Sequence, residues 1–325
     1  MVEGLIGYVR DAFGWTGDIA VSPGPRGALG QIWRLEVGSA RYALKEIFSE
    51  PPSEALIAAE LAFARSAASA GVRLPASHPA RDGCYLLTAP SGTWLRLYDW
   101  VDLTPVAPTA HTTPGELGAL LARLHRGALA SSTEPGGQPP DAWYDTVPAE
   151  HEWTVVAASG AAWAGHLAER LADLPALSAA IAPANPADLV ICHRDLHPDN
   201  VRADPDGALV VVDWDNLGPA VPGRELARAL FDWFCEGPTI ELDAMLTMVR
   251  AYRAEGGPGR VTGPADFTML LAGRLNFLLR QTRIAIDPRA EARHREWAEL
   301  EIDEGLRILP TPRQLADVLT LIRDA

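Results

Sequence analysis

The sequence has almost no lysine. Of its 28 Lys and Arg residues, only Lys45, in the segment RYALKEI, is a lysine. The two side chains are not interchangeable, because lysine is a compact ammonium on a flexible stem and arginine is a broad, planar fork. We therefore expect Lys45 to occupy a position that a guanidinium fills poorly.

Cysteine and long hydrophobic runs are also scarce. The three cysteines, Cys84, Cys192 and Cys235, are widely spaced and form no CxxC pair, which disfavours a disulfide framework or a thiolate zinc site. No apolar run reaches the roughly 18 residues that a membrane-spanning helix needs. The first residues lack the basic-then-apolar layout of a signal peptide. These absences predict a cytoplasmic protein with free thiols.

Positive charge is in deficit. The net charge is −14 and the pI is about 5.0, which argues against nucleic acid or an anionic membrane as a partner. Residues 1–100 carry 9 basic and 10 acidic side chains, whereas residues 101–325 carry 19 and 32. The excess of acid in the second part is explained either by solubility or by a cationic ligand.

The chain changes character near residue 100. Residues 18–47 contain three β-like runs, with Gly38 and Ser39 forming a turn between the last two. A helical pattern follows Ser53, and two further strand-like runs lie within 84–101. After residue 101 the pattern is mainly helical. We expect an α+β protein with a small antiparallel sheet in residues 1–100 and a helical part in residues 101–325.

The densest polar cluster lies in the segment VICHRDLHPDNVRADPDGALVVVDWDN, residues 190–216. Apolar runs bound it, so it indicates a strand, a polar loop, a hairpin and a strand that ends at Asp213. Phosphoryl transfer requires a carboxylate to orient the attacking hydroxyl, oxygen ligands for Mg²⁺ and a cation on the nucleotide phosphates. Asp195 fits the first role, and Asn200 and Asp213 fit the second.

The segments HRDLHPDN at 193–200 and VVDWD at 211–215 resemble the catalytic and metal-binding segments of the aminoglycoside phosphotransferase family of small-molecule kinases. The resemblance implies a two-lobed, protein-kinase-like fold that uses ATP or GTP with Mg²⁺. It places Lys45 on the third strand as the phosphate-binding lysine. Its expected helix partner is Glu60, with Glu54 as the alternative.

The same resemblance extends to the nucleotide site. It implies that the loop PGPRGALG, with Gly27 and Gly30, covers the phosphates, although the glycines depart from the usual protein-kinase spacing. It also implies that the backbone C=O of Asp99 and N–H of Val101 bind adenine. The contact made by Arg194, either phosphate or its own loop, is left open by the sequence.

The sequence says least about the acceptor substrate and the residues that bind it. Only about ten residues separate Asp213 from the next helical pattern, too few for the regulated segment of a protein kinase, so we expect a small-molecule substrate and no protein substrate. We expect four acidic residues to line the site and favour a cationic, aminoglycoside-like acceptor: Asp199, Asp215, Asp232 and Glu236. The alternatives are a metabolic amino-alcohol, amino-acid or sugar kinase and a non-catalytic nucleotide-binding pseudokinase.

Overall fold

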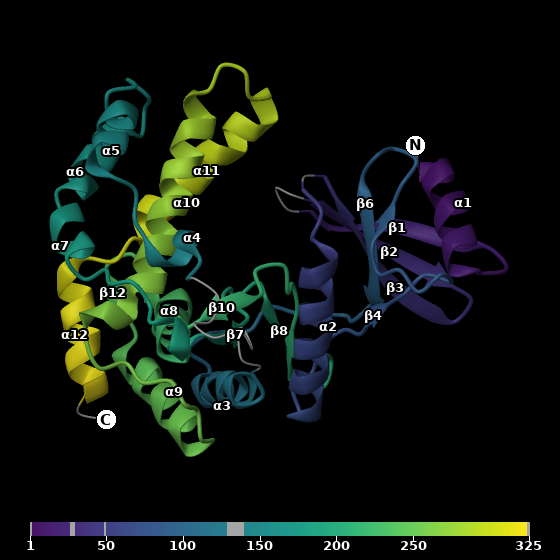
Figure 1. The fold of residues 1–325 in the computed structure, drawn as a ribbon, viewed down its shortest axis with the longest axis horizontal. Helices are drawn as coiled ribbons and strands as arrows, with labels where there is room; N and C mark the ends of the chain where they lie inside the picture. Colours follow the sequence, from purple (N-terminus) through teal and green to yellow (C-terminus); the bar gives the residue numbers. More distant parts are fainter. Residues whose placement is uncertain (1, 27–29, 49, 129–139, 324–325) are drawn as a thin grey trace.

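The first part of the chain is built around one antiparallel sheet (Figure 1). The structure, a computed structural model, describes residues 2–26, 30–48, 50–128 and 140–323. The strand order is β1-β2-β3-β6-β4, and β5 also pairs with β6. The bounds are β1 (Ile19–Arg26), β2 (Gly30–Val37), β3 (Ala40–Ile47), β4 (Ser77–His78), β5 (Leu87–Thr88) and β6 (Trp94–Asp99).

Alternating apolar residues make one face of this sheet a small core. Leu35, Leu44, Leu95 and Leu97 are almost fully buried on it. The helix α1 (Val2–Phe13), which was not predicted from the sequence, closes that face with Val9. The β2–β3 turn places Gly38 at φ 61°, a conformation that glycine adopts without strain. The predicted sheet is therefore confirmed, with one helix more than expected.

Helix α2 (Glu54–Ser69) begins at the expected cap, since the Ser53 side chain accepts a hydrogen bond from the Leu56 N–H. Its buried residues Phe63 and Ala67 belong to the core of the second part of the chain and not to the core under the sheet. Phe63 meets Trp214 edge-on at 5.7 Å between ring centroids. The helix thus connects the two parts of the molecule (Figure 1).

The second part is mainly helical, as predicted. Its larger helices pack in pairs, with α3 against α9 and α10 against α11. The helices are α3 (Thr113–Arg126), α4 (Ala142–Asp145), α5 (Glu150–Ala157), α6 (Ala164–Leu171), α7 (Leu174–Ser178), η1 (Pro186–Asp188), α8 (Pro222–Phe234), α9 (Leu242–Ala254), η2 (Pro264–Phe267), α10 (Thr268–Ile286), α11 (Ala292–Ile308) and α12 (Pro312–Arg323).

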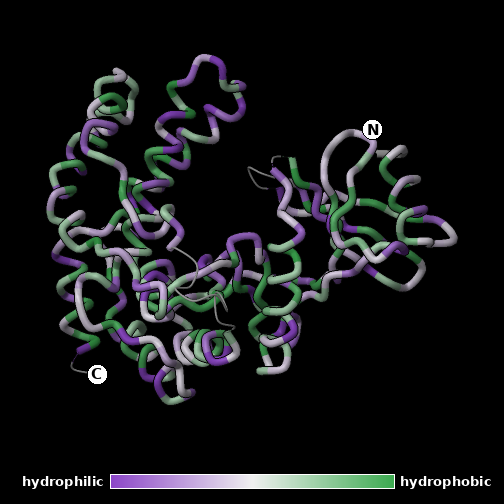
Figure 2. The backbone as a smooth tube through the Cα atoms, in the orientation of Figure 1, coloured by the Kyte–Doolittle hydropathy of each residue, from purple (hydrophilic) through white to green (hydrophobic). Residues whose placement is uncertain are grey.

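Short antiparallel strand pairs lie between these helices. They are β7 (Val190–Cys192) with β10 (Gly218–Ala220), β8 (Val201–Ala203) with β9 (Leu209–Val211), and β11 (Cys235–Glu236) with β12 (Thr239–Ile240). The strands β7, β8 and β9 belong to the polar segment. Hydrophobic and hydrophilic residues are interspersed along both parts of the chain (Figure 2). Within the described residues, no helix is both long enough and apolar enough to cross a bilayer.

Candidate active site

Two strained residues mark the polar segment. Arg194 lies at φ 65° in the loop between β7 and β8, and Asp213 lies at φ 58° after β9. Among the described residues, no other non-glycine residue has a positive φ. Such conformations cost about 1–3 kcal/mol each and persist only where surrounding contacts impose them. Both strained positions therefore fall in the two segments from which function was predicted.

Buried contacts hold Arg194 in this conformation. Its backbone N–H donates to the Glu225 carboxylate from α8, and His125 lies 2.7 Å from the other oxygen of the same carboxylate. Burial alone would raise the pKa of Glu225, but the bond to His125, nearby histidine charge and the Arg194 N–H together lower it. His125 also contacts the Tyr252 hydroxyl at 2.7 Å. The loop is thus tied to α3, α8 and α9.

The Arg194 side chain binds protein groups. It donates to the backbone oxygen of Asn216 at 2.6 Å and pairs with Asp141 at 2.8 Å. Its guanidinium lies 4.5 Å from the ring centroid of Tyr144. Of the two roles left open by the sequence, these contacts match the one in which Arg194 structures the loop.

Asp195 is held by several donors. Its Oδ2 accepts from the side-chain amides of Asn216 at 2.9 Å and Asn200 at 3.1 Å, and its Oδ1 accepts from Arg228 at 2.6 Å. Burial alone would raise the pKa of Asp195, but His197, 3.6 Å away, and the charge of Arg228 outweigh it and keep the pKa well below its usual range. Asp195 is therefore an oriented, ionised carboxylate.

Asn200 and Asp213 offer oxygen atoms that suit a magnesium ion. The Asn200 amide nitrogen donates to the Asp195 backbone oxygen at 2.9 Å as well as to its carboxylate, which directs the Asn200 amide oxygen away from them. The Asp213 carboxylate uses its Oδ1 on Lys45, and Oδ2 has no hydrogen bond within the described residues. A carboxylate and an amide oxygen are the hard ligands that Mg²⁺ prefers.

Lys45 reaches across from the sheet to this segment. Its ammonium lies 2.9 Å from Asp213 Oδ1 and 2.6 Å from Asp215 Oδ2. Burial alone would lower the pKa of Lys45, but the two carboxylates raise it, so the side chain is a cation. The position of Lys45 on β3 agrees with the expectation from the sequence, and its charge lies between the sheet and the proposed metal ligands.

The expected pairing of Lys45 with Glu60 is absent from the structure. Glu60 instead forms a two-pronged ion pair with Arg96, at 2.5 and 3.0 Å, and both side chains are buried. Arg96 stands directly opposite Lys45 in the β3–β6 ladder. The planar guanidinium matches a carboxylate at two points, which an ammonium cannot do. Arg96 is thus the residue that holds Glu60.

The other residues predicted to bind the nucleotide differ in what the structure describes of them. Gly27 lies outside the described residues. At Gly30, a Cβ would lie 2.5 Å from the Glu46 backbone oxygen, so glycine is required by the close approach of two strands. The Asp99 side chain accepts from the Ala76 N–H at 3.1 Å and lies 2.6 Å from His78. The nucleotide contacts expected of Gly27, Gly30, Asp99 and Val101 stay predictions.

The four acids expected to line the acceptor site each have a basic partner. Asp199 pairs with Arg202, Asp215 with Lys45, Glu236 with Arg307, and Asp232 with both Arg228 and Arg274. Asp199 and Glu236 are about four-fifths exposed, at 81% and 80%. The expectation that these four acids line the acceptor site stays a prediction, and within the described residues each of them already has a basic partner.

Three residues at the site were not predicted. Asn216 and Arg228 bind the Asp195 carboxylate directly. The Tyr144 hydroxyl donates to Asn216 Oδ1 at 3.4 Å, and the Tyr144 ring lies beside Arg194 and Arg228. Asn216 stands within the polar segment and could have been suspected. Tyr144 and Arg228 lie in unremarkable helical sequence, and no local signal identifies them.

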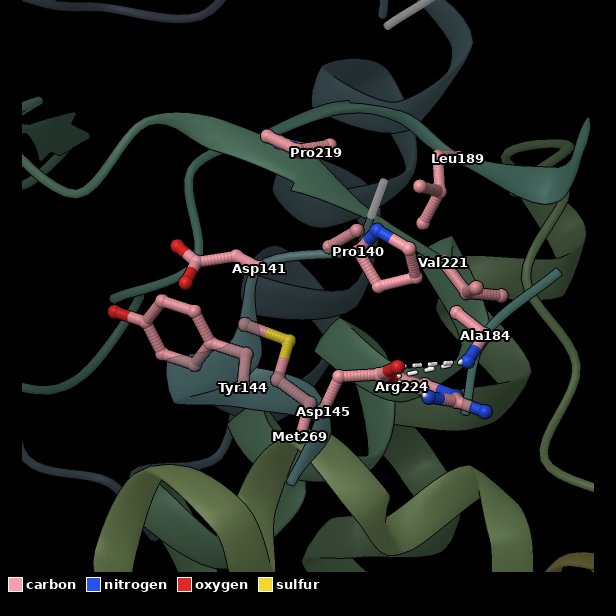
Figure 3. Close-up of a pocket in the computed structure, with 11 residues that line it drawn as sticks. Pro140, Asp141, Tyr144, Asp145, Ala184, Leu189, Pro219, Val221, Arg224 and Met269 are labelled. Carbon is pink, nitrogen blue, oxygen red and sulfur yellow. Dashed lines mark hydrogen bonds and ion pairs between the residues drawn. The ribbon is translucent and has the colours of Figure 1, made fainter. Parts of the chain in front are cut away.

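A small hollow is lined by residues of α4, β10 and α8 (Figure 3). Tyr144 and Asp141 stand on one side of it, and the buried pair of Asp145 with Arg224 on the other. Asp145 accepts from Arg224 at 2.6 Å and from the Ala184 N–H at 3.0 Å. The polar groups that line this side are satisfied by one another, which indicates a structural role for this hollow.

Solved structures with the same fold are kinases and phosphotransferases. A spectinomycin phosphotransferase, APH(9)-Ia, in complex with ADP and spectinomycin is 13% identical, with a TM-score of 0.61 and coverage of 96% of this chain and 98% of that one. The amicoumacin kinase hAmiN with AMP-PNP, Ca²⁺ and Ami is 16% identical, with a TM-score of 0.63 and coverage of 96% of both chains. A microcompartment-associated aminopropanol kinase is 19% identical, with a TM-score of 0.64 and coverage of 97% and 98%.

These likenesses show the two-lobed, kinase-like fold and nothing finer, because fold does not fix substrate. No curated protein matches the chain. The sequence model of the phosphotransferase enzyme family matches residues 20–264, which include Lys45 and the segments predicted to be catalytic, 193–200, and metal-binding, 211–215. The chain belongs to the phosphotransferase enzyme family.

Proposed function

We propose that this protein transfers the γ-phosphoryl group of ATP directly to a hydroxyl of a small organic acceptor. The observation that carries the proposal is the convergence of Lys45, Asp213 and Asp195. Lys45 contacts Asp213 at 2.9 Å, and Asn200, the other proposed metal ligand, binds the Asp195 carboxylate at 3.1 Å. A phosphate-binding cation, a metal position and an orienting carboxylate thus adjoin one another.

Each residue then has a defined task. Lys45 turns from the two carboxylates to the α- and β-phosphates. Asn200 and Asp213 would hold Mg²⁺, which when bound would neutralise charge on the phosphates. The acceptor oxygen forms a bond to the γ-phosphorus as the bond to the β–γ bridging oxygen breaks, and ADP leaves. Asp195 orients the hydroxyl and accepts its proton, for which a weak base suffices because the transition state is loose.

The acceptor we favour is a small molecule that carries both a hydroxyl and an amine. Spectinomycin and aminopropanol, named for two similar structures, motivate this class, as does the acidic balance of residues 101–325. Asp215 is the best-placed acid for the amine, because its partner Lys45 is the cation that nucleotide binding would draw away. Asp199 and Glu236, exposed and paired elsewhere, are weaker candidates.

A role in resistance and a role in metabolism differ in the acceptor and not in the chemistry. The test is a panel of aminoglycosides, amicoumacin-type antibiotics, aminopropanol, choline, homoserine and simple sugars, each incubated with Mg-ATP. Phosphorylated product is detected by mass spectrometry and ADP by a coupled assay. Product with an amine-bearing acceptor is the expected result. Product only with neutral sugars would overturn the amine requirement, and ATP binding without turnover on any acceptor would favour a nucleotide sensor.

A further inference from the structure

The Asp195 carboxylate has one strong charged contact. Its Oδ2 accepts hydrogen bonds from the side-chain amides of Asn200 and Asn216, and both residues belong to the polar segment. Its Oδ1 accepts a hydrogen bond from Nη2 of Arg228, on helix α8, at 2.6 Å. Within the described chain, the other ion-pairing neighbour of Asp195 is His197, at 3.6 Å. Arg228 is thus the contact that ties the carboxylate to the helical scaffold.

Arg228 is itself anchored. Its Nε donates to Asp232 at 3.1 Å, one turn further along α8. The other oxygen of Asp232 accepts from Arg274 of α10 at 2.7 Å, and Arg274 also donates to the backbone oxygen of Ile308. The ring of Tyr144 packs beside the guanidinium of Arg228, 5.6 Å from its centroid. Negative and positive groups alternate from Asp195 to Arg274.

These four charged side chains are largely shielded from water. The exposed fraction of the side chain is 18% for Asp195 and Arg228, 12% for Asp232 and 10% for Arg274. In such surroundings charge pairs are weakly screened and hold their geometry. Removing one member leaves its neighbours as buried, unpaired charges, which drives them to rearrange.

We propose that Arg228 is a positioning residue for phosphoryl transfer. This inference rests on the function proposed above. Arg228 directs the Asp195 carboxylate toward the acceptor hydroxyl, and Asp232 and Arg274 keep Arg228 in place. Asp232 then supports the catalytic group through Arg228 and does not contact the acceptor. Misplacement of a reacting group by about 1 Å can reduce turnover about 100-fold.

Helix α8 supplies a matched control one turn earlier. Arg224 is also a buried arginine, paired with Asp145 at 2.6 Å and bonded to the Ala182 backbone oxygen at 2.8 Å. Figure 3 shows this pair on the far side of the hollow from Asp141. Arg224 makes no contact with Asp195, so its replacement removes a comparable ion pair without touching the carboxylate.

The experiment compares Arg228→Met with Arg224→Met. ADP release is measured with an acceptor and also without one, where water replaces it, and thermal unfolding reports the folded fraction. We expect Arg228→Met to lower kcat about 100-fold while the KM for ATP stays within about twofold, and Arg224→Met to keep kcat per folded molecule. Equal kcat in the two variants would overturn the inference. A raised acceptor KM with unchanged kcat would also overturn it, since Arg228 would then bind substrate.

A crystal structure of the Arg228→Met variant gives a readout independent of turnover. The Asp195 carboxylate is expected to move from its wild-type position, and an unmoved carboxylate would contradict the proposal. If this variant does not fold, Arg228→Lys is used, because lysine keeps the positive charge but lacks the rigid, planar fork through which Arg228 holds Asp195 and Asp232. Absence of wild-type ADP release would contradict the proposed function alone, since the structural readout would still stand.

Discussion

At the scale of single residues, Lys45 is held in place by two carboxylates. It lies within 3 Å of both Asp213 and Asp215, and its side chain is 16% exposed. The space between the sheet and these carboxylates suits a compact ammonium. A guanidinium there would spread its charge over a wider fork and reach the phosphates from a different position.

The first prediction concerns this geometry. Lys45→Arg keeps the charge but should lower kcat/KM for ATP by about 100-fold, because the cation no longer sits at the phosphates. Steady-state kinetics with Mg-ATP measures the loss, and circular dichroism checks the fold. Near-normal kinetics in the variant would show that the lone lysine is not a geometric requirement.

Glu60 and Arg96 form the second residue-scale feature. Their ion pair is buried, with exposed fractions of 5% and 0%. Glu60→Gln leaves the Arg96 charge without a carboxylate and should lower the free energy of unfolding by about 3–5 kcal/mol. Urea denaturation measures this loss. Lys45→Met serves as the comparison: it should abolish turnover without similar destabilisation. Equal destabilisation by the two variants would indicate that Glu60 and Lys45 act as one pair.

At the scale of elements, the catalytic loop depends on helices that are distant in sequence. Glu225 of α8 accepts the Arg194 N–H and thereby supports a positive φ. Its pKa is lowered in the folded protein because the His125 contact and the Arg194 N–H outweigh its burial. Stability from Glu225 is therefore complete above its unfolded pKa of about 4.3 and is lost as the pH falls through the lower folded value.

This linkage gives a pH prediction. The urea midpoint of the wild-type protein should fall more steeply between about pH 4.5 and 3 than that of Glu225→Gln, in which the titrating carboxylate is gone. Unfolding curves at a series of pH values measure the two slopes. Parallel slopes would mean that Glu225 binds protons equally in the folded and unfolded states.

Element identity was easier to predict from the sequence than element contacts. The strands β1, β2, β3 and β6, the capped helix α2 and the polar segment carry local signals in their turns, periodicity and motifs. Glu60 and Lys45 both stand at the positions expected of a pair, yet Arg96 on the neighbouring strand holds Glu60. Arg228 and Tyr144 could not be found at all, since their importance arises only where α4 and α8 meet the loop.

At the scale of the whole molecule, the two parts are joined by a shared core. Phe63 and Ala67 of α2, together with Val72, pack with helices of the second part. The boundary near residue 100 stays a prediction, because these contacts tie residues 54–72 to the helical part of the chain.

Residues 101–325 expressed alone should accordingly not unfold cooperatively. Phe63→Ala in the full chain should cost about 3–5 kcal/mol, as expected for truncating a buried aromatic side chain. Urea denaturation tests both. A cooperative, stable fragment would show that α2 is dispensable to the larger core.

The proposed function rests most directly on Asp195, and one measurement tests it. Asp195→Asn preserves the shape of the side chain but removes the charge that orients the acceptor hydroxyl. Mg-ATP-dependent ADP release, with the best acceptor of the panel, is compared between this variant and the wild-type protein, and calorimetry follows ATP binding. We predict that turnover is lost while ATP still binds. Undiminished turnover in Asp195→Asn would contradict the proposed role of this carboxylate.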